Sequence, residues 1–127
     1  MNLKMSRCKH INKLQWSQYH DNGYGYYFST DVEVCKNCDY ITIDGYTVKE
    51  LEKREINLIS KFRKTIGEEL AQKHFEDLVL TDKEAKLLAN YSEEINELTY
   101  LSMVNGYAEM LNSMSIEEIA EYEVKEA

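Results

Sequence analysis

Two close pairs of metal-ligand residues near the N-terminus constrain the fold of this chain more than any other feature. Cys8 and His10 are separated by one residue, and Cys35 and Cys38 form a C-x-x-C pair 24 residues beyond His10. Three thiolates and one imidazole, arranged as two pairs a hairpin's length apart, match the ligand set of a tetrahedral Zn²⁺ ion. The sequence therefore predicts a structural zinc site made by Cys8, His10, Cys35 and Cys38.

Each pair has a spacing that lets both of its side chains reach one ion. In extended backbone, positions i and i+2 point to the same side, so Cys8 and His10 are expected to bind together. Cys35 and Cys38 suit a tight turn whose backbone N–H groups point at the sulfur atoms. Four protein ligands leave no position for water or substrate, which favours a structural site over a catalytic one. For a module of about 45 residues, metal binding would supply folding free energy that a small core alone barely provides.

Three other interpretations of these residues stay open. His20 can replace His10 as a ligand, although His20 lies beside the predicted turn at residues 21–23. Cys35 and Cys38 can be buried thiols with His10 at the surface. A redox dithiol is the third interpretation, but redox C-x-x-C pairs lie at a helix N-terminus, whereas the strand-like residues 40–43 follow here.

The region resembles a zinc ribbon. The resemblance covers residues 8–43 and rests on Cys8-x-His10 and Cys35-x-x-Cys38 flanking a predicted hairpin. Similar modules occur in transcription factors, in small phage proteins, and in MqsA-type antitoxins, where a zinc-binding domain precedes a helical DNA-binding domain. The resemblance implies a scaffold or docking element. The first pair is C-x-H where MqsA-type proteins have C-x-x-C, and Asp39 stands where many ribbons have Gly.

Residues 13–43 have the pattern of a small antiparallel sheet. Leu14, Trp16 and Gln18 alternate with polar neighbours, and Asp-Asn-Gly at residues 21–23 is typical of a turn. The aromatic run at residues 24–28 is typical of a strand, so a hairpin is expected. Further strands are expected on either side of the Cys35–Cys38 turn, which gives three or four strands in all.

From Thr47 onward, apolar residues recur with the period of helices. Thr47 and Glu50 have the form of a capping box, and an apolar stripe then continues to Gly67. Gly67 either ends the helix or interrupts it, because the same spacing continues through residues 70–78.

Short amphipathic helices are expected in the remainder of the chain. Thr81, Ser92 and Ser115 are predicted N-caps, and Asn105-Gly106 is predicted to form a turn. The sequence thus predicts an α+β fold, with a zinc-stabilised β-hairpin module at residues 1–46 and a bundle of short, acidic α-helices at residues 47–127.

The charge of the 127-residue chain is unevenly distributed. The net charge is −8 overall, zero for residues 1–48, +3 for residues 49–64 and −11 for residues 65–127. No Lys, Arg or His occurs between Lys86 and Lys125. Helices that read DNA present basic and amide side chains, so direct nucleic-acid binding by this part is not expected. The basic residues 49–64 are either a nucleic-acid contact or a solvated helix face.

No catalytic set is recognised in the sequence. There is no nucleophile paired with a base and no glycine-rich phosphate loop, and His74 falls on an apolar stripe that favours a core position. We therefore expect a protein that is not an enzyme; a zinc enzyme with His20 near the metal is the alternative.

Candidate partner-binding residues are aromatic or basic. A small sheet has more rings than it can bury on one face, and Tyr and Trp anchor interfaces. Alternatively, the rings pack on the first helix. The candidates are Trp16, Tyr24, Tyr26, Tyr27, Arg54, Arg63 and Lys64.

Together these features predict a zinc-binding regulatory or inhibitory protein that acts by binding another protein. The partner is expected to be basic or nucleic-acid-associated, as for a phage or mobile-element inhibitor of a nucleic-acid-processing complex, and a homodimer is compatible with the sequence. The alternative is a DNA-binding transcription regulator of the antitoxin type. No stretch approaches the roughly 18 apolar residues of a membrane span, and residues 1–10 have no apolar run for export, so a cytoplasmic protein is expected, in the host cytoplasm if phage-encoded.

Overall fold

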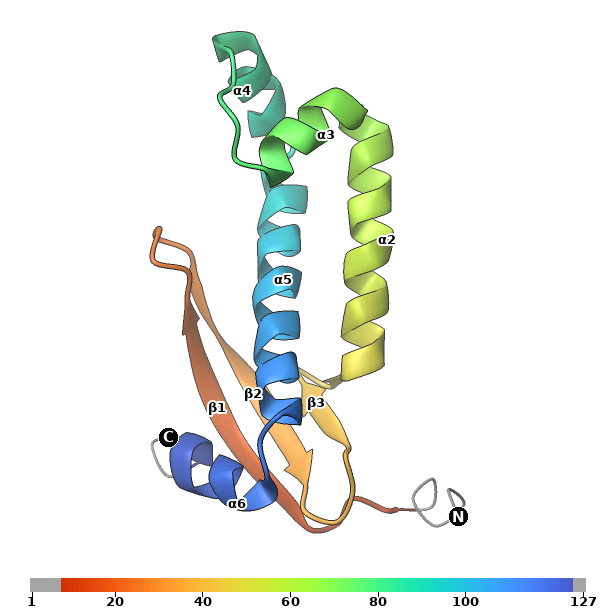
Figure 1. Ribbon diagram of the computed structural model, residues 1–127, viewed down its shortest axis with the longest axis vertical. Helices are drawn as coiled ribbons and strands as arrows, with labels where there is room; N and C mark the ends of the chain where they lie inside the picture. Colours follow the sequence, from red (N-terminus) through yellow and green to blue (C-terminus); the bar gives the residue numbers. More distant parts are fainter. Residues whose placement is uncertain (1–7, 125–127) are drawn as a thin grey trace. The chain divides into compact units, whose positions relative to one another are not determined.

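The computed structural model describes residues 8–124 and shows an α+β protein (Figure 1). A four-stranded antiparallel sheet precedes five α-helices in this part of the chain, so the predicted fold class is confirmed. Residues 1–7 and 125–127 lie outside the described residues, and with them Lys4, Arg7, Lys125 and the outer ends of both predicted domains.

The sheet is a meander in which neighbouring strands pair in sequence order. It consists of β1 (Lys13–Asp21), β2 (Tyr27–Cys35), β3 (Ile41–Ile43) and β4 (Tyr46–Thr47), in the order β1-β2-β3-β4. Trp16 is paired with Val32, and Val34 with Ile41. Because side chains alternate between the faces of a sheet, this register places these four buried residues on one face.

The predicted strand at residues 24–28 begins later than expected. Tyr24 and Tyr26 lie in the loop between β1 and β2, and only Tyr27 onward is in the strand. The Asn22 side chain explains the difference, because its Oδ1 accepts hydrogen bonds from the backbone N–H groups of Tyr24 and Tyr26 at 2.8 and 3.1 Å. An Asx-type loop of this kind competes with strand pairing.

The first helix begins and ends as the sequence indicates. α2 (Val48–Ile66) follows Thr47, whose hydroxyl accepts from the N–H of Glu50 while the Glu50 carboxylate accepts from the N–H of Thr47. Gly67 has φ 93° and ψ 150°, a backbone conformation that is almost restricted to glycine. It separates α2 from α3 (Glu68–Phe75) and therefore interrupts the helical path.

The remaining helices are α4 (Asp82–Ala89), α5 (Ser92–Asn112) and α6 (Ile116–Ile119), followed by the π-helical turn η1 (Ala120–Val124). Thr81 and Ser115 form the predicted capping boxes with Glu84 and Glu118. Leu78, expected to extend the stripe of α3, lies instead in the loop after it, because α3 ends at Phe75 and Asp77 adopts a positive φ of 54°.

Two expectations for the helical half are wrong. The helices after Gly67 are not all short, since α5 has 21 residues, whereas the 19 residues of α2 agree with the apolar stripe that ends at Gly67. Asn105 and Gly106 form no turn and lie inside α5, where the side-chain N–H of Asn105 donates to the carbonyl oxygen of Leu51 at 3.1 Å. Burial of the neighbouring Val104 and Ala108, together with this hydrogen bond, favours a continuous helix over a turn, despite the roughly 1 kcal/mol that Gly costs inside a helix relative to Ala.

The chain forms two compact units, whose boundaries fall inside α2 and α5. The sheet unit contains the chain up to Leu51 and from Met103 onward, and the helical unit contains Glu52–Ser102. The division into a β module at residues 1–46 and a helical region at residues 47–127 stays a prediction.

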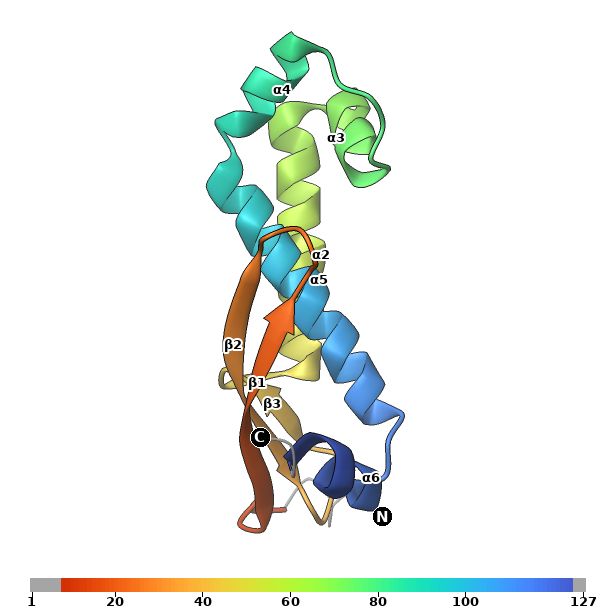
Figure 2. The same ribbon diagram turned by 90° about the vertical axis from the view of Figure 1, so that its left-hand side faces the viewer.

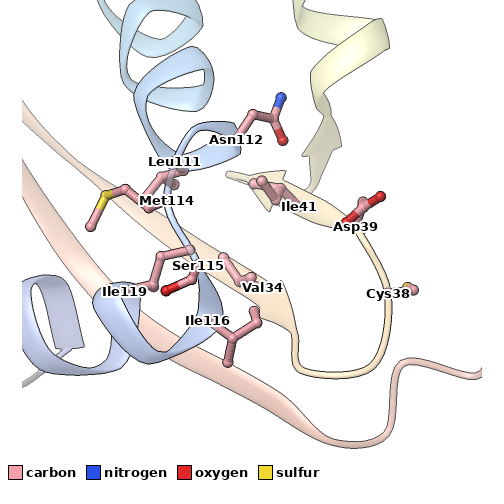
Figure 3. A pocket seen from close by; sticks show the side chains of 10 residues that line it. All are labelled: Val34, Cys38, Asp39, Ile41, Leu111, Asn112, Met114, Ser115, Ile116 and Ile119. Carbon is pink, nitrogen blue, oxygen red and sulfur yellow. The ribbon is translucent and has the colours of Figure 1, made fainter.

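Each unit has its own apolar core. In the sheet unit, the end of α5 and α6 lie along the sheet, and Leu111 and Ile119 are buried with Val34 and Ile41 (Figures 1 and 3). In the helical unit, α3 and α4 lie beside the C-terminal end of α2 (Figure 2). The buried cluster there is Phe62, Leu70, Leu88 and Leu98.

Candidate metal centre

The four predicted ligands lie together in the sheet unit. One ligand atom from each of Cys8, His10, Cys35 and Cys38 lies within 4.8 Å of the others. The Sγ atoms of Cys8 and Cys35 are 3.6 Å apart, and the Sγ of Cys38 is 3.3 Å from the Nδ1 of His10. All three cysteines are free thiols. The pairing of the two motifs, predicted from spacing, is therefore present in the fold.

The first pair converges by a different backbone route from the one expected. Residues 8–11 precede β1 and are not in a strand, and His10 has a positive φ of 52°. This left-handed conformation, uncommon for a residue with a Cβ, turns the chain at His10. The expectation of an extended Cys8–His10 segment is thus wrong, although both side chains still reach the cluster.

The second pair has the predicted tight turn. Cys35 is the last residue of β2, and its Sγ accepts a hydrogen bond from the backbone N–H of Asn37 at 3.4 Å. The backbone N–H of Cys35 donates to the carbonyl oxygen of Tyr40 at 2.9 Å, which closes the loop around Cys38. N–H groups aimed at sulfur stabilise the thiolate form that binds metals.

The pKa values of the two thiols in the second pair are shifted in opposite directions. Burial raises the pKa of Cys35, but hydrogen bonds from His10, the Asn37 N–H and the two other cysteines outweigh burial and lower this pKa to about 6. Burial raises the pKa of Cys38 to about 11, with the neighbouring sulfur atoms of Cys8 and Cys35 adding to the effect. The opposite shifts follow from the closeness of the sulfur atoms, because one thiolate disfavours the ionisation of a neighbouring thiol.

A further aromatic residue holds the histidine. The His10 ring stacks on the ring of Tyr40, with centroids 3.8 Å apart and 10° between the planes. The sequence pattern indicates a strand at Tyr40 and no role for it at the ligand cluster. The signal that could have indicated one is an aromatic residue two positions after the last ligand.

A cavity of about 180 Å³ lies next to the loop that carries Cys38 (Figure 3). Cys38 and Asp39 contribute to its wall from the loop between β2 and β3. Leu111 contributes from the end of α5, Met114 from the loop after it and Ile119 from α6. The loop that carries a ligand is thus part of the same packed region as the C-terminal helices.

His20 takes no part in the cluster. It is buried at the other end of β1, where its Nε2 lies 2.8 Å from the Oγ1 of Thr30 and its ring stacks on Phe28, with centroids 4.8 Å apart. Burial lowers the pKa of His20, which favours the neutral ring. The alternative in which His20 replaces His10 therefore finds no support in this geometry.

The predicted aromatic partner residues differ in exposure. Tyr24 is 93% exposed and Tyr27 is also exposed, whereas Trp16 is only 7% exposed and donates from Nε1 to the Oε1 of Gln18 at 3.1 Å. Tyr26 is half-buried beside Phe28. Trp16 is thus part of the core of the sheet unit.

The predicted basic residues are partly neutralised within the helical unit. Arg54 forms an ion pair with Glu97 at 3.0 Å, and Arg63 forms one with Glu68 and lies over the Phe75 ring. Lys64 is exposed. His74, half-buried against Phe62 and Phe75, takes the core position expected of it.

No family model, curated protein or solved structure matches this chain. Among residues 8–124, no helix combines the length and the apolar composition that crossing a membrane requires.

Proposed function

We propose that Cys8, His10, Cys35 and Cys38 hold a structural Zn²⁺ ion. The observation that carries the proposal is the mutual distance of their ligand atoms, 3.6 Å between the sulfurs of Cys8 and Cys35 and 3.3 Å between Cys38 and His10. Zn–S bonds of about 2.3 Å and Zn–N bonds of about 2.1 Å in a tetrahedron imply edges of about 3.8 and 3.6 Å. The cluster needs little rearrangement to accept an ion of this size.

The donor set supports a structural rather than a catalytic role. Three sulfurs and one imidazole complete the four-coordinate shell, so no position is left for a reacting water. Mg²⁺ and Ca²⁺ prefer oxygen ligands, which this set does not contain.

Metal analysis of the purified chain tests this site. We expect one Zn²⁺ per chain, and a Co²⁺-substituted sample with the absorption of a tetrahedral S₃N centre. His10→Ala should shift that spectrum, whereas His20→Ala should leave it unchanged because His20 is bonded to Thr30. A metal-free protein, or a centre with an exchangeable water, would contradict the proposal.

We further propose that the chain is a non-enzymatic regulatory or inhibitory protein that binds a basic, nucleic-acid-associated protein. Support comes from the −11 net charge of residues 65–127 and from the exposure of Glu109, Glu117 and Glu121 in the sheet unit. The ion pairs of Arg54 and Arg63 reduce the positive charge that DNA binding by α2 would need.

Affinity capture with matched charge variants tests this role. Glu109, Glu117 and Glu121 changed together to Gln should lose the captured basic protein, and nuclease treatment should leave wild-type capture intact. The control variant changes three exposed residues of the helical unit, Glu52, Glu76 and Glu93, to Gln. The two variants therefore have the same net charge and differ only in where the carboxylates are removed. A gel shift with DNA at physiological salt, together with loss of capture after nuclease, would favour the antitoxin-type alternative and contradict this role.

A further inference from the structure

An open groove in the sheet unit lies where the end of β1 meets α5. It encloses about 420 Å³ and is lined from β1 by residues that include Tyr19 and Asp21, and from α5 by Met103, Gly106, Tyr107 and Met110. The groove is separate from the metal cluster, none of whose ligands contributes to its lining.

Gly106 is the residue of this groove that packing within the chain does not explain. It lies inside α5, where glycine weakens a helix relative to alanine. A Cβ built on Gly106 would meet no atom within 4 Å among the described residues, so no close approach of the chain requires glycine there. What glycine does provide is a stretch of bare helix backbone at the floor of the groove, open to another molecule.

The residues around Gly106 are apolar and accessible. Met110 is 41% exposed and Tyr19 is 58% exposed, while Met103 and Tyr107 are half-buried. Methionine side chains adapt to varied apolar groups, and tyrosine rings anchor interfaces. Tyr107 is held in place because its hydroxyl contacts the Glu123 carboxylate at 2.5 Å and the Oε1 of Gln18 at 3.0 Å.

The charged residue that lines the groove is negative. Asp21 lines it, no Lys or Arg does so, and residues 87–124 contain no basic side chain. A positively charged occupant is therefore complementary to the groove, and an acidic one is repelled.

We propose that this groove binds a basic amphipathic segment of a partner protein. An apolar side chain of the segment lies over Gly106 between Met103 and Met110, and a Lys or Arg beside it faces Asp21. The proposal rests on the proposed protein-binding function and assigns that function a place on the surface.

Methionine methyl NMR of the zinc-loaded full chain tests the groove directly. The probe is a synthetic amphipathic helical peptide with Leu on one face and Lys on the other. The matched control peptide has Glu at every Lys position. We expect the Lys peptide to shift the methyl signals of Met103 and Met110 but not that of Met114, which lines the other cavity. No shift with the Lys peptide, or equal shifts with both peptides, would overturn the proposal.

Two substitutions at one position separate docking from folding. Gly106→Ala and Gly106→Leu should both raise the melting temperature because both favour the helix, but only Leu fills the groove. We expect Gly106→Leu to weaken binding of the Lys peptide at least tenfold, and Gly106→Ala to weaken it by a smaller factor, because one methyl group covers less of the helix backbone that glycine exposes. Asp21→Asn should weaken it also, while the exposed Asp31→Asn should not.

The outcomes distinguish this proposal from the function on which it rests. If the Lys peptide binds equally to wild type and Gly106→Leu, the assignment of this groove as the binding site is wrong, although a protein-binding role stands. In the opposite case, wild type captures no basic protein through its acidic residues, while Gly106→Leu still abolishes peptide binding. The groove is then a binding site, and the proposed regulatory role is wrong.

Discussion

The imidazole of His10 stacks on the ring of Tyr40, with centroids 3.8 Å apart, while its Nδ1 lies 3.3 Å from the Sγ of Cys38. The stack restrains the ring of a residue whose backbone has a positive φ. A ligand that is held in orientation before the ion arrives loses less conformational entropy on binding. Tyr40 is therefore a positioning residue for the proposed metal centre.

Tyr40→Ala should weaken zinc binding by about tenfold, because groups that orient a ligand typically contribute 10- to 100-fold to metal affinity. Tyr40→Phe keeps the stacked ring and should bind as wild type does. Competition with a chromophoric chelator measures both affinities. Tyr24→Ala, at an exposed loop position, is the control, and an equal loss in that variant would contradict the role of the stack.

Truncating one core residue in each unit should separate metal binding from helix packing. Leu111→Ala and Leu88→Ala each remove a buried leucine and should cost about 2–5 kcal/mol in the free energy of unfolding. Leu111 shares a cavity wall with Cys38, so its truncation should also weaken zinc binding, whereas Leu88 belongs to the helical unit.

Urea unfolding and chelator competition on the same samples measure the two effects. Equal losses of zinc affinity in the two leucine variants would show that the metal centre depends on both cores.

The same substitution should have opposite effects at two glycines. Gly67→Ala forces a Cβ into a conformation with φ 93° and ψ 150°, which costs about 1–3 kcal/mol. Gly106→Ala lies inside a helix with space around it and should stabilise the protein by up to about 1 kcal/mol. The urea midpoint measures both changes. Shifts of the same sign at both positions would contradict the backbone conformations described.

His74 should make stability depend on pH. Burial against Phe62 and Phe75 lowers its pKa below the usual value of 6.5, although Asp77 partly opposes this. Between the folded pKa and the unfolded value near 6.5, the unfolded chain binds more protons than the folded chain. The contribution of the neutral ring is therefore complete above about pH 6.5 and is lost as the pH falls toward the folded pKa.

Comparison with His74→Gln isolates this effect, because both proteins keep the other two histidines. The decrease of the urea midpoint between pH 7.5 and 5.5 should be smaller in the variant than in wild type. Identical decreases would show that His74 titrates at its ordinary pKa in the fold.

Local patterns in the sequence predicted much of the secondary structure. The capping boxes at Thr47, Thr81 and Ser115 mark helix starts, because a cap depends on residues three positions apart. The ligand cluster was also predictable, since two spaced pairs of Cys and His have few other uses in a reduced chain.

Long-range contacts explain where the structure differs from the sequence-based predictions. Asn105-Gly106 has the composition of a turn, but its place in α5 depends on a hydrogen bond to Leu51, 54 positions away. Tyr40 reaches His10 only because the loop after β2 folds back beside the first ligand pair. No local pattern encodes either contact.

The sequence by itself determined the four candidate ligands, the change from strand to helix near Thr47 and the acidic character of the second half. Those features depend on residue type and short spacing, which act before any tertiary contact forms. Only the tertiary structure decided that the C-terminal residues from Met103 onward complete the sheet unit, with Leu111 and Ile119 against Val34 and Ile41. That choice depends on which apolar faces bury each other, and a periodic pattern shows that a face is apolar but not what covers it.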